Sequence, residues 1–303
     1  MGPEQAGDRR GVRRRAAAAL ALVLLPMLGA PAVALEIPVA SREYKQGIDI
    51  AALGVQEISG AAALAGRLRG MLDRAGTGDG TAPVFEPGRR RMVRFLDTDD
   101  CRLWQAGLLL RLRGGEEGGA AAEKVTLKAR SQDLFRIAGL SLEARGEGKG
   151  GGRSWQDDFY LSAVGDGGLV PVSDYALSVT WDGAAPTGLG ALRERVANLS
   201  EVLPEAGEAP LRPGPAITEV ALRSGPLRIA GRKTRLELSL WYRQADGRLL
   251  AGDLSFTLKL PLAPGEARQA GDALAGLRAA LGRAAGGEAE KSIRALPEGC
   301  GKG

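Results

Sequence analysis

Histidine is absent from this chain of 303 residues, and only two residues are cysteine. The missing histidine excludes a histidine-based catalytic triad, a histidine general base and a histidine-ligated metal. Aromatic residues make up only 4% of the chain, so a stacking surface for single-stranded nucleic acid is not expected. The remaining composition, with 44% hydrophobic and 25% charged residues, is that of an ordinary globular protein.

The N-terminal region has the pattern of a secretory signal peptide. Five arginines in residues 9–15 precede an apolar run over residues 16–28, and an A-x-A motif ends at Ala34. We therefore expect residues 1–34 to be removed and the protein to be exported, either periplasmic or secreted. A signal anchor that stays attached is the alternative. No later apolar stretch approaches the length of a membrane span, so none is expected after cleavage.

Charge and cysteine content leave the partners open. The formal net charge of +5 comes partly from the basic leader, so it gives no reason to expect nucleic-acid binding. Cys101 and Cys300 could form a disulfide in an oxidising compartment or could stay as free thiols, and the sequence does not decide between these states. No feature of the sequence identifies a protein partner.

Most of the chain after residue 90 alternates with the period of two that is typical of β-strands. The segments with this pattern are 91–97, 108–114, 123–130, 139–146, 157–162, 175–182, 216–225, 234–243 and 250–260. Helical spacing occurs over residues 61–76, 187–203 and 264–284. Because strands are grouped between helices rather than alternating with them one to one, the pattern favours an α+β fold with antiparallel strands. We assign residues 35–262 to this domain and residues 263–303 to a C-terminal helix and tail.

Several of these strands carry one apolar and one charged face, because residues two apart in a strand point the same way. Arg111 and Arg113 share a face, and Lys124, Thr126 and Lys128 share another. An open antiparallel sheet with one solvated face explains this pattern most simply. A closed barrel also explains it, with charged faces toward a lumen and helices over the apolar outside.

A motif in the middle of the chain adds to this pattern. An aromatic-rich strand ends in D-T, a leucine and a glycine follow at fixed offsets, and then come L-R-x-R and a strand ending in T-L-K. The residues concerned are Phe95, Asp97, Thr98, Leu103, Gly107, Leu110, Arg111, Arg113, Thr126, Leu127 and Lys128. This arrangement resembles the signature of the CYTH-like superfamily, the triphosphate tunnel metalloenzymes. Segments 154–161 and 253–259 resemble later strands of such proteins, so the resemblance covers most of residues 41–260.

The resemblance implies an eight-stranded antiparallel CYTH-like β-barrel with flanking helices, whose tunnel holds a triphosphate and Mg²⁺ or Mn²⁺. The basic residues that would bind phosphate are Lys45, Arg111, Arg113, Lys128, Arg235 and Lys259. The carboxylates that would hold the metal are Glu43, Glu143, Glu219 and Glu237. Two departures affect the metal ligands. Ser41 stands where the family's E-x-E-x-K motif has its first glutamate, and the strand that contains Asp253 lacks the usual E-x-E pair.

These observations lead to three hypotheses. The first is an exported barrel that binds a phosphate-containing anion in a charged tunnel, with weakened or lost catalysis. The alternative is a metal-dependent triphosphate or polyphosphate phosphohydrolase, so whether the protein is an enzyme stays open. The third begins from Asp97 and Asp99, because an apolar strand followed by D-x-D presents the nucleophile of haloacid-dehalogenase-type phosphatases.

Overall fold

The computed structural model describes residues 39–53, 65–67, 69–70, 84–115, 124–145, 152–164, 168–204, 207–286 and 295–301. The chain divides into two compact units, residues 1–36 and residues 37–303, and the second is the subject of this section. The predicted signal peptide of residues 1–34 lies outside the described residues and stays a prediction. The predicted helix 61–76 lies largely outside them as well.

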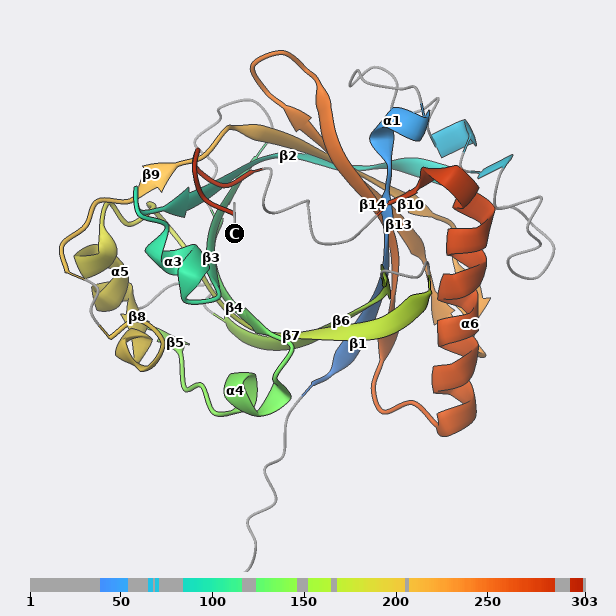
Figure 1. Ribbon diagram of the computed structural model, residues 1–303, viewed down its shortest axis with the longest axis horizontal. Helices are drawn as coiled ribbons and strands as arrows, with labels where there is room; N and C mark the ends of the chain where they lie inside the picture. Colours follow the sequence, from blue (N-terminus) through green and yellow to red (C-terminus); the bar gives the residue numbers. More distant parts are fainter. Residues whose placement is uncertain are drawn as a thin grey trace, which may run out of the picture. The chain divides into compact units, whose positions relative to one another are not determined.

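The core of the structure is a closed β-barrel of nine strands, seen along its axis in Figure 1. In order around the ring they are β10 (Ile217–Ser224), β13 (Leu236–Arg243), β14 (Leu249–Lys259), β1 (Ser41–Ile48), β6 (Gly152–Ala163), β7 (Leu169–Asp182), β4 (Lys124–Ser131), β3 (Leu108–Gly114) and β2 (Phe85–Asp97). The ring closes because β2 also pairs with β10. The α+β class and the barrel are therefore confirmed.

The expectation of eight antiparallel strands is wrong in both number and direction. Strands can alternate in direction around a closed ring only if their number is even, so a ring of nine needs a parallel pair. That pair is β1 and β6, with Glu43 opposite Asp158, while the other neighbouring strands in the ring are antiparallel. The predicted strand 139–146 is reduced to β5 (Glu143–Ala144), which lies outside the ring.

Alternation along the strands separates a polar inside from an apolar outside. In β3, Arg111 and Arg113 line the lumen, while Leu110 and Leu112 belong to an outer hydrophobic cluster. This arrangement confirms the closed barrel and excludes the open sheet with one solvated face. In the hairpin connection between β13 and β14, Gly247 has a φ of 66°, a left-handed conformation that glycine adopts without strain.

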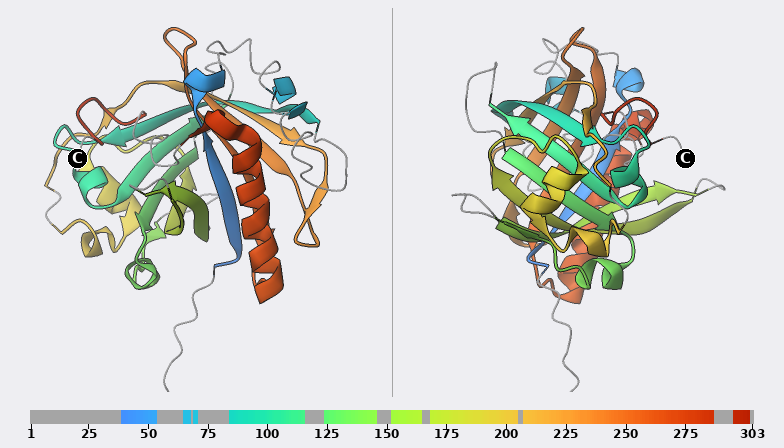
Figure 2. Two further views of the ribbon diagram at one scale, coloured as in Figure 1. Left: turned by 45° about the vertical axis from the view of Figure 1, so that its right-hand side comes forward. Right: turned by 90° about the vertical axis from the view of Figure 1, so that its left-hand side faces the viewer.

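The C-terminal helix α6 (Pro264–Leu281) covers one side of the barrel. Its residues Ala270, Leu274, Leu277 and Leu281 are buried against the outer faces of β1, β13 and β14. Figures 1 and 2 show this helix along the outside of the strands. The predicted helix 264–284 is confirmed, although its last turn is a 3₁₀ helix, Gly282–Ala284.

Short helices cover the outer faces of β3, β4 and β7 on another side. They are α3 (Arg102–Gln105), α4 (Leu134–Ala138), α5 (Leu189–Arg195) and the 3₁₀ helix Leu199–Glu201. The predicted helix 187–203 ends early, because β8 (Val196–Ala197) pairs with β5. The remaining described elements are α1 (Ile50–Leu53), β9 (Arg212–Pro213), β11 (Leu227–Ile229), β12 (Arg232–Thr234) and β15 (Ala285–Gly286). Among the helices described, none combines the length and apolar character needed to cross a membrane.

A disulfide joins the C-terminal segment to the barrel. Cys101 and Cys300 are bonded, with 5.4 Å between their Cα atoms and 199 positions between them in the sequence. In this segment Ala295 and Leu296 pack in one cluster with apolar residues of β2, β3, β10 and β13. The segment passes close to Gly214. A side chain at position 214 would place its Cβ 2.4 Å from the Ala295 carbonyl oxygen, so only glycine fits here.

Candidate anion-binding site

The barrel lumen contains a cavity of about 720 Å³ with an uneven distribution of charge. Its basic lining residues are Lys45, Arg91, Arg111, Arg113, Lys128 and Arg130. Its acidic lining residues are Glu43, Asp158, Asp174, Glu219, Glu237 and Asp253. Five of the six cations come from β2, β3 and β4, whereas all six carboxylates come from the other strands of the ring. The lumen therefore has a cationic wall that faces carboxylate-bearing strands.

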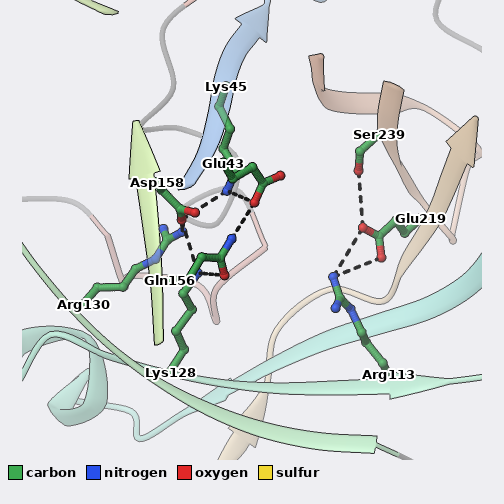
Figure 3. A network of polar contacts seen from close by, with 9 residues as sticks. All are labelled: Glu43, Lys45, Arg113, Lys128, Arg130, Gln156, Asp158, Glu219 and Ser239. Carbon is green, nitrogen blue, oxygen red and sulfur yellow. Dashed lines mark hydrogen bonds and ion pairs between the residues drawn. The ribbon is translucent and has the colours of Figure 1, made fainter. Parts of the chain in front are cut away.

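One cluster in the lumen centres on the buried carboxylate of Asp158 (Figure 3). Its Oδ2 lies 3.1 Å from Lys45 Nζ, 3.2 Å from Lys128 Nζ and 2.6 Å from Arg130 Nη2. Gln156 accepts a hydrogen bond from Lys128 at 3.3 Å and donates one to Glu43. Three cations from two strands thus converge on a single carboxylate oxygen.

Burial and charge act against each other on the pKa values in this cluster. Burial raises the pKa of Asp158, but the charges of Lys128, Lys45 and Arg130 outweigh it and hold that pKa well below its usual value. Burial, together with repulsion from Arg130, lowers the pKa of Lys128 to about 7. The Asp158 carboxylate partly opposes that shift.

A second cluster is formed around Glu219 in β10 (Figure 3). Its carboxylate accepts a hydrogen bond from Arg91 Nε and lies 3.4 Å from Arg113 Nη2. The Ser239 hydroxyl is 3.3 Å from the other carboxylate oxygen. Glu219 thereby balances part of the positive charge of β2 and β3.

Arg111 is the lumen cation that no described carboxylate binds. Its Nε is buried without a hydrogen-bond partner, and no ion pair forms between this guanidinium and another described residue. Burial and the neighbouring charge of Arg113 lower the pKa of Arg111 well below its usual value, with smaller effects of the same sign from Arg91 and Arg130. Glu219 is the carboxylate that opposes them. An anion beside Arg111 would relieve this repulsion.

The cavity continues into a basic mouth lined by residues of β2, β3, β4, β6 and β7. This mouth has a volume of about 700 Å³ and shares Arg91, Arg111 and Arg113 with the main cavity. Arg89, Arg90 and Lys124 add further positive charge, and no carboxylate belongs to the described residues that line it. An anion can therefore approach Arg111 along a path lined by cations.

Four of the six predicted phosphate-binding residues are brought together in the lumen, namely Lys45, Arg111, Arg113 and Lys128. Arg235 lines an adjacent opening of about 420 Å³. Lys259 is exposed at the end of β14, opposite Ser41 in the pairing of β14 with β1, and does not line the main cavity.

The four predicted metal ligands do not form one site. Glu43 is 3.2 Å from Lys45, Glu219 is bound by arginines, and Glu237 is 2.8 Å from Arg223. Glu143 is exposed on β5, outside the ring, and lies 3.9 Å from Arg153. Over the described part of the chain, no three acidic or cysteine side chains are grouped as metal ligands. These residues therefore do not fit the Mg²⁺ or Mn²⁺ that the resemblance implies, and we assign no step to a metal.

Sequence reasoning missed Arg91, Arg130 and Asp158. Arg130 continues the alternation of Lys124, Thr126 and Lys128, so the same parity rule identifies it. Arg91 lies two and four residues before Val93 and Phe95, which share its face, but it occurs in a run of three arginines. Asp158 follows Asp157, and a doublet does not reveal which carboxylate points inward.

The third hypothesis depended on Asp97 as a nucleophile. Asp97 is fully buried, and its carboxylate accepts hydrogen bonds from the backbone N–H groups of Thr98, Leu103 and Trp104. Asp99 is exposed and paired with Arg212. Asp97 therefore has a structural role at the start of α3, and the two carboxylates do not share a site.

The fold and lumen define this chain as a closed, mixed β-barrel with a charged interior. No protein-family model and no curated protein matches its sequence. Solved structures with similar folds include a candidate adenylate cyclase from Bacillus halodurans (TM-score 0.40, 12% identity, covering 84% of this chain and 98% of that one). Another is a candidate adenylyl cyclase from Hippeastrum, described as having a dominant triphosphatase activity. Its TM-score is 0.43 at 14% identity, and the match covers 84% of this chain and 95% of that one. A third is a candidate adenylate cyclase from Vibrio parahaemolyticus. Its TM-score is 0.33 at 11% identity, and the match covers 84% of this chain and 97% of that one. With TM-scores below 0.5, these matches carry no functional assignment to this chain.

Proposed function

We propose that the barrel binds a phosphate-type polyanion in its lumen, with Arg111 as the central contact. The observation that carries this proposal is the half-buried Arg111, whose Nε is buried without a hydrogen-bond partner, which has no anionic partner among the described residues and which lies beside other arginines. Burying a charge without a partner is costly, so a bound anion would stabilise the site.

The chemistry of the cationic wall fits phosphate. A guanidinium presents a planar set of donors that matches phosphate oxygens in pairs, and charge-assisted hydrogen bonds are stronger than neutral ones. Arg91, Arg111 and Arg113 lie on adjacent strands and line both the cavity and its mouth. An anion with several charged groups would contact more than one of them.

We propose binding rather than metal-dependent hydrolysis. The carboxylates that a catalytic metal would need are already paired with cations, as Glu43 with Lys45 and Glu219 with Arg91. We further propose that the protein acts after export. The basic and apolar pattern of residues 1–34 supports this, as does the Cys101–Cys300 disulfide, because such bonds persist in oxidising compartments.

Calorimetric titration of the protein with tripolyphosphate, without added metal, tests the proposal. We expect one saturable site, and we expect R111A to weaken binding by roughly 10- to 100-fold, the range for losing charge-assisted hydrogen bonds. R248A is the matched control, because Arg248 is exposed in the β13–β14 connection, and it should bind as the wild type does.

Absence of binding by folded wild-type protein, or equal binding by R111A, would contradict the proposal. Phosphate release from tripolyphosphate in the presence of Mg²⁺ or Mn²⁺, above the rate in buffer, would instead support the hydrolytic alternative.

A further inference from the structure

Asp158 stands out because one of its oxygens has the surroundings of a bound anion. Oδ2 has three cationic neighbours within 3.2 Å, Lys45, Lys128 and Arg130. Oδ1 is buried and has no hydrogen-bond partner among the described residues. A cluster of three cations around one oxygen resembles the contacts that a phosphate oxygen would receive in the same place.

Like charges on both sides make this position unusual for a carboxylate. Asp158 is opposite Glu43 of β1 and opposite Asp174 of β7 in the strand pairing. All three carboxylates line the lumen. Directly opposed like charges destabilise a sheet, so the cations of β1 and β4 stabilise Asp158 against its neighbours.

We infer that Asp158 is a specificity-determining residue of the lumen, a tethered carboxylate that occupies the Lys45, Lys128 and Arg130 cluster and confines a ligand to Arg111 and the basic mouth. This inference rests on the proposed function. It accounts for the balance of Lys128 and Arg130 from within the chain, whereas Arg111 has no such partner among the described residues. The ligand class that follows is an anion bound along β2 and β3, rather than one surrounded by cations on all sides.

Replacing Asp158 by the isosteric asparagine tests this inference. D158N removes the carboxylate that pairs with Lys128 and Arg130 and one carboxylate beside Lys45, so tripolyphosphate should bind at least tenfold more tightly than to the wild type. D174N is the matched control, because Asp174 lines the same cavity but its carboxylate accepts a hydrogen bond from the Tyr160 hydroxyl, at 3.4 Å, rather than pairing with a described cation. Removing that charge should change the affinity by less than about threefold, the scale of a partly screened charge.

A second variant keeps the test decisive if D158N does not fold. In the wild-type background Arg130 is engaged by Asp158, so R130Q should weaken tripolyphosphate binding by less than about threefold. Loss of binding in R130Q comparable to that in R111A would overturn the inference, because Arg130 would then be a direct ligand contact.

The outcomes separate this inference from the proposed function. Binding by the wild type with no gain in D158N overturns the role of Asp158 and leaves anion binding intact. Binding by D158N alone supports the role of Asp158 and contradicts anion binding by the native protein. Binding by neither protein contradicts both.

Discussion

Arg111 and Lys128 face the same lumen but differ in how their charge is balanced. Lys128 donates to Asp158 and Gln156, whereas Arg111 has no such partner among the described residues. Both lose stabilising water on burial, which lowers both pKa values. An arginine with a lowered pKa stays charged at neutral pH, but a lysine with a pKa of about 7 does not fully do so.

The pKa of Lys128 predicts a pH-dependent stability. A free lysine titrates near 10.4, so between pH 7 and about 10 the unfolded chain keeps a proton that folded Lys128 has lost. The free energy of unfolding therefore rises with pH across this window. Few other groups titrate there, because the chain has no histidine and both cysteines are in a disulfide. The charged groups that act on Lys128 are Arg130, Asp158, Lys45 and Arg111.

Urea unfolding of the wild type and of K128M from pH 6 to pH 9.5 measures this effect. The wild type should gain stability relative to K128M as the pH rises. A constant difference between the two proteins would show that Lys128 stays protonated throughout the window.

The alternation of side chains between the two faces of a strand explains which site residues could be predicted from the sequence and which could not. Arg111, Arg113 and Lys128 were found because alternation holds along β3 and β4. The same rule places Lys259 on the same face as Asp253, but alternation carries no information about where a strand passes the rim of the barrel. The contact of Asp158 with Lys45 depends on the parallel pairing of β1 and β6, and its contacts with Lys128 and Arg130 depend on the position of β4 in the ring. No local sequence pattern encodes either arrangement.

Among the elements, the C-terminal segment and the Cys101–Cys300 bond pack beside two aromatic residues of the lumen. Ala295, Leu296 and Cys300 are buried in one cluster with Phe95 and Trp241, two residues that also line the main cavity. Cys101 precedes α3, whose start is held by Asp97. The bond therefore connects the C-terminal segment to the start of α3.

Removing this bond should lower stability without removing the anion site. A disulfide across 199 positions restricts the unfolded chain strongly, so C101S/C300S should lose about 2–5 kcal/mol of unfolding free energy. Chemical denaturation measures the loss, and titration with tripolyphosphate should show binding within about threefold of the wild type, because Arg111 belongs to neither segment. Unchanged stability would show that packing of Ala295 and Leu296 alone holds the segment.

Helices and strands were predicted correctly where a regular hydrophobic pattern extended over many residues. They were missed where pairing with a distant strand determined the secondary structure. Helix 264–284 had a continuous apolar stripe and was found. Residues 41–48 are absent from the segments with strand periodicity, because both faces of β1 carry polar side chains, yet pairing with β14 and β6 makes them a barrel strand. Helix 187–203 was too long, because Val196–Ala197 pairs with β5.

At the scale of the whole molecule, two features stand out, the odd number of strands in the ring and the uneven distribution of charge in the lumen. The single parallel contact between β1 and β6 closes a ring that cannot alternate throughout. Helix α6 and the short helices lie along the outside of the strands (Figure 2). They bury the apolar outer faces, so the charged faces are left to point inward. Cations on β2, β3 and β4 opposite carboxylates on the remaining strands give the lumen one side that favours an anion.

A crystal structure of the protein with tripolyphosphate tests this account most directly. We predict the anion inside the barrel, with phosphate oxygens on the Arg111 guanidinium and toward Arg91 and Arg113, while Asp158 keeps its contacts with Lys128 and Arg130. An empty lumen at saturating tripolyphosphate, or an anion bound only to the outer surface, would contradict it.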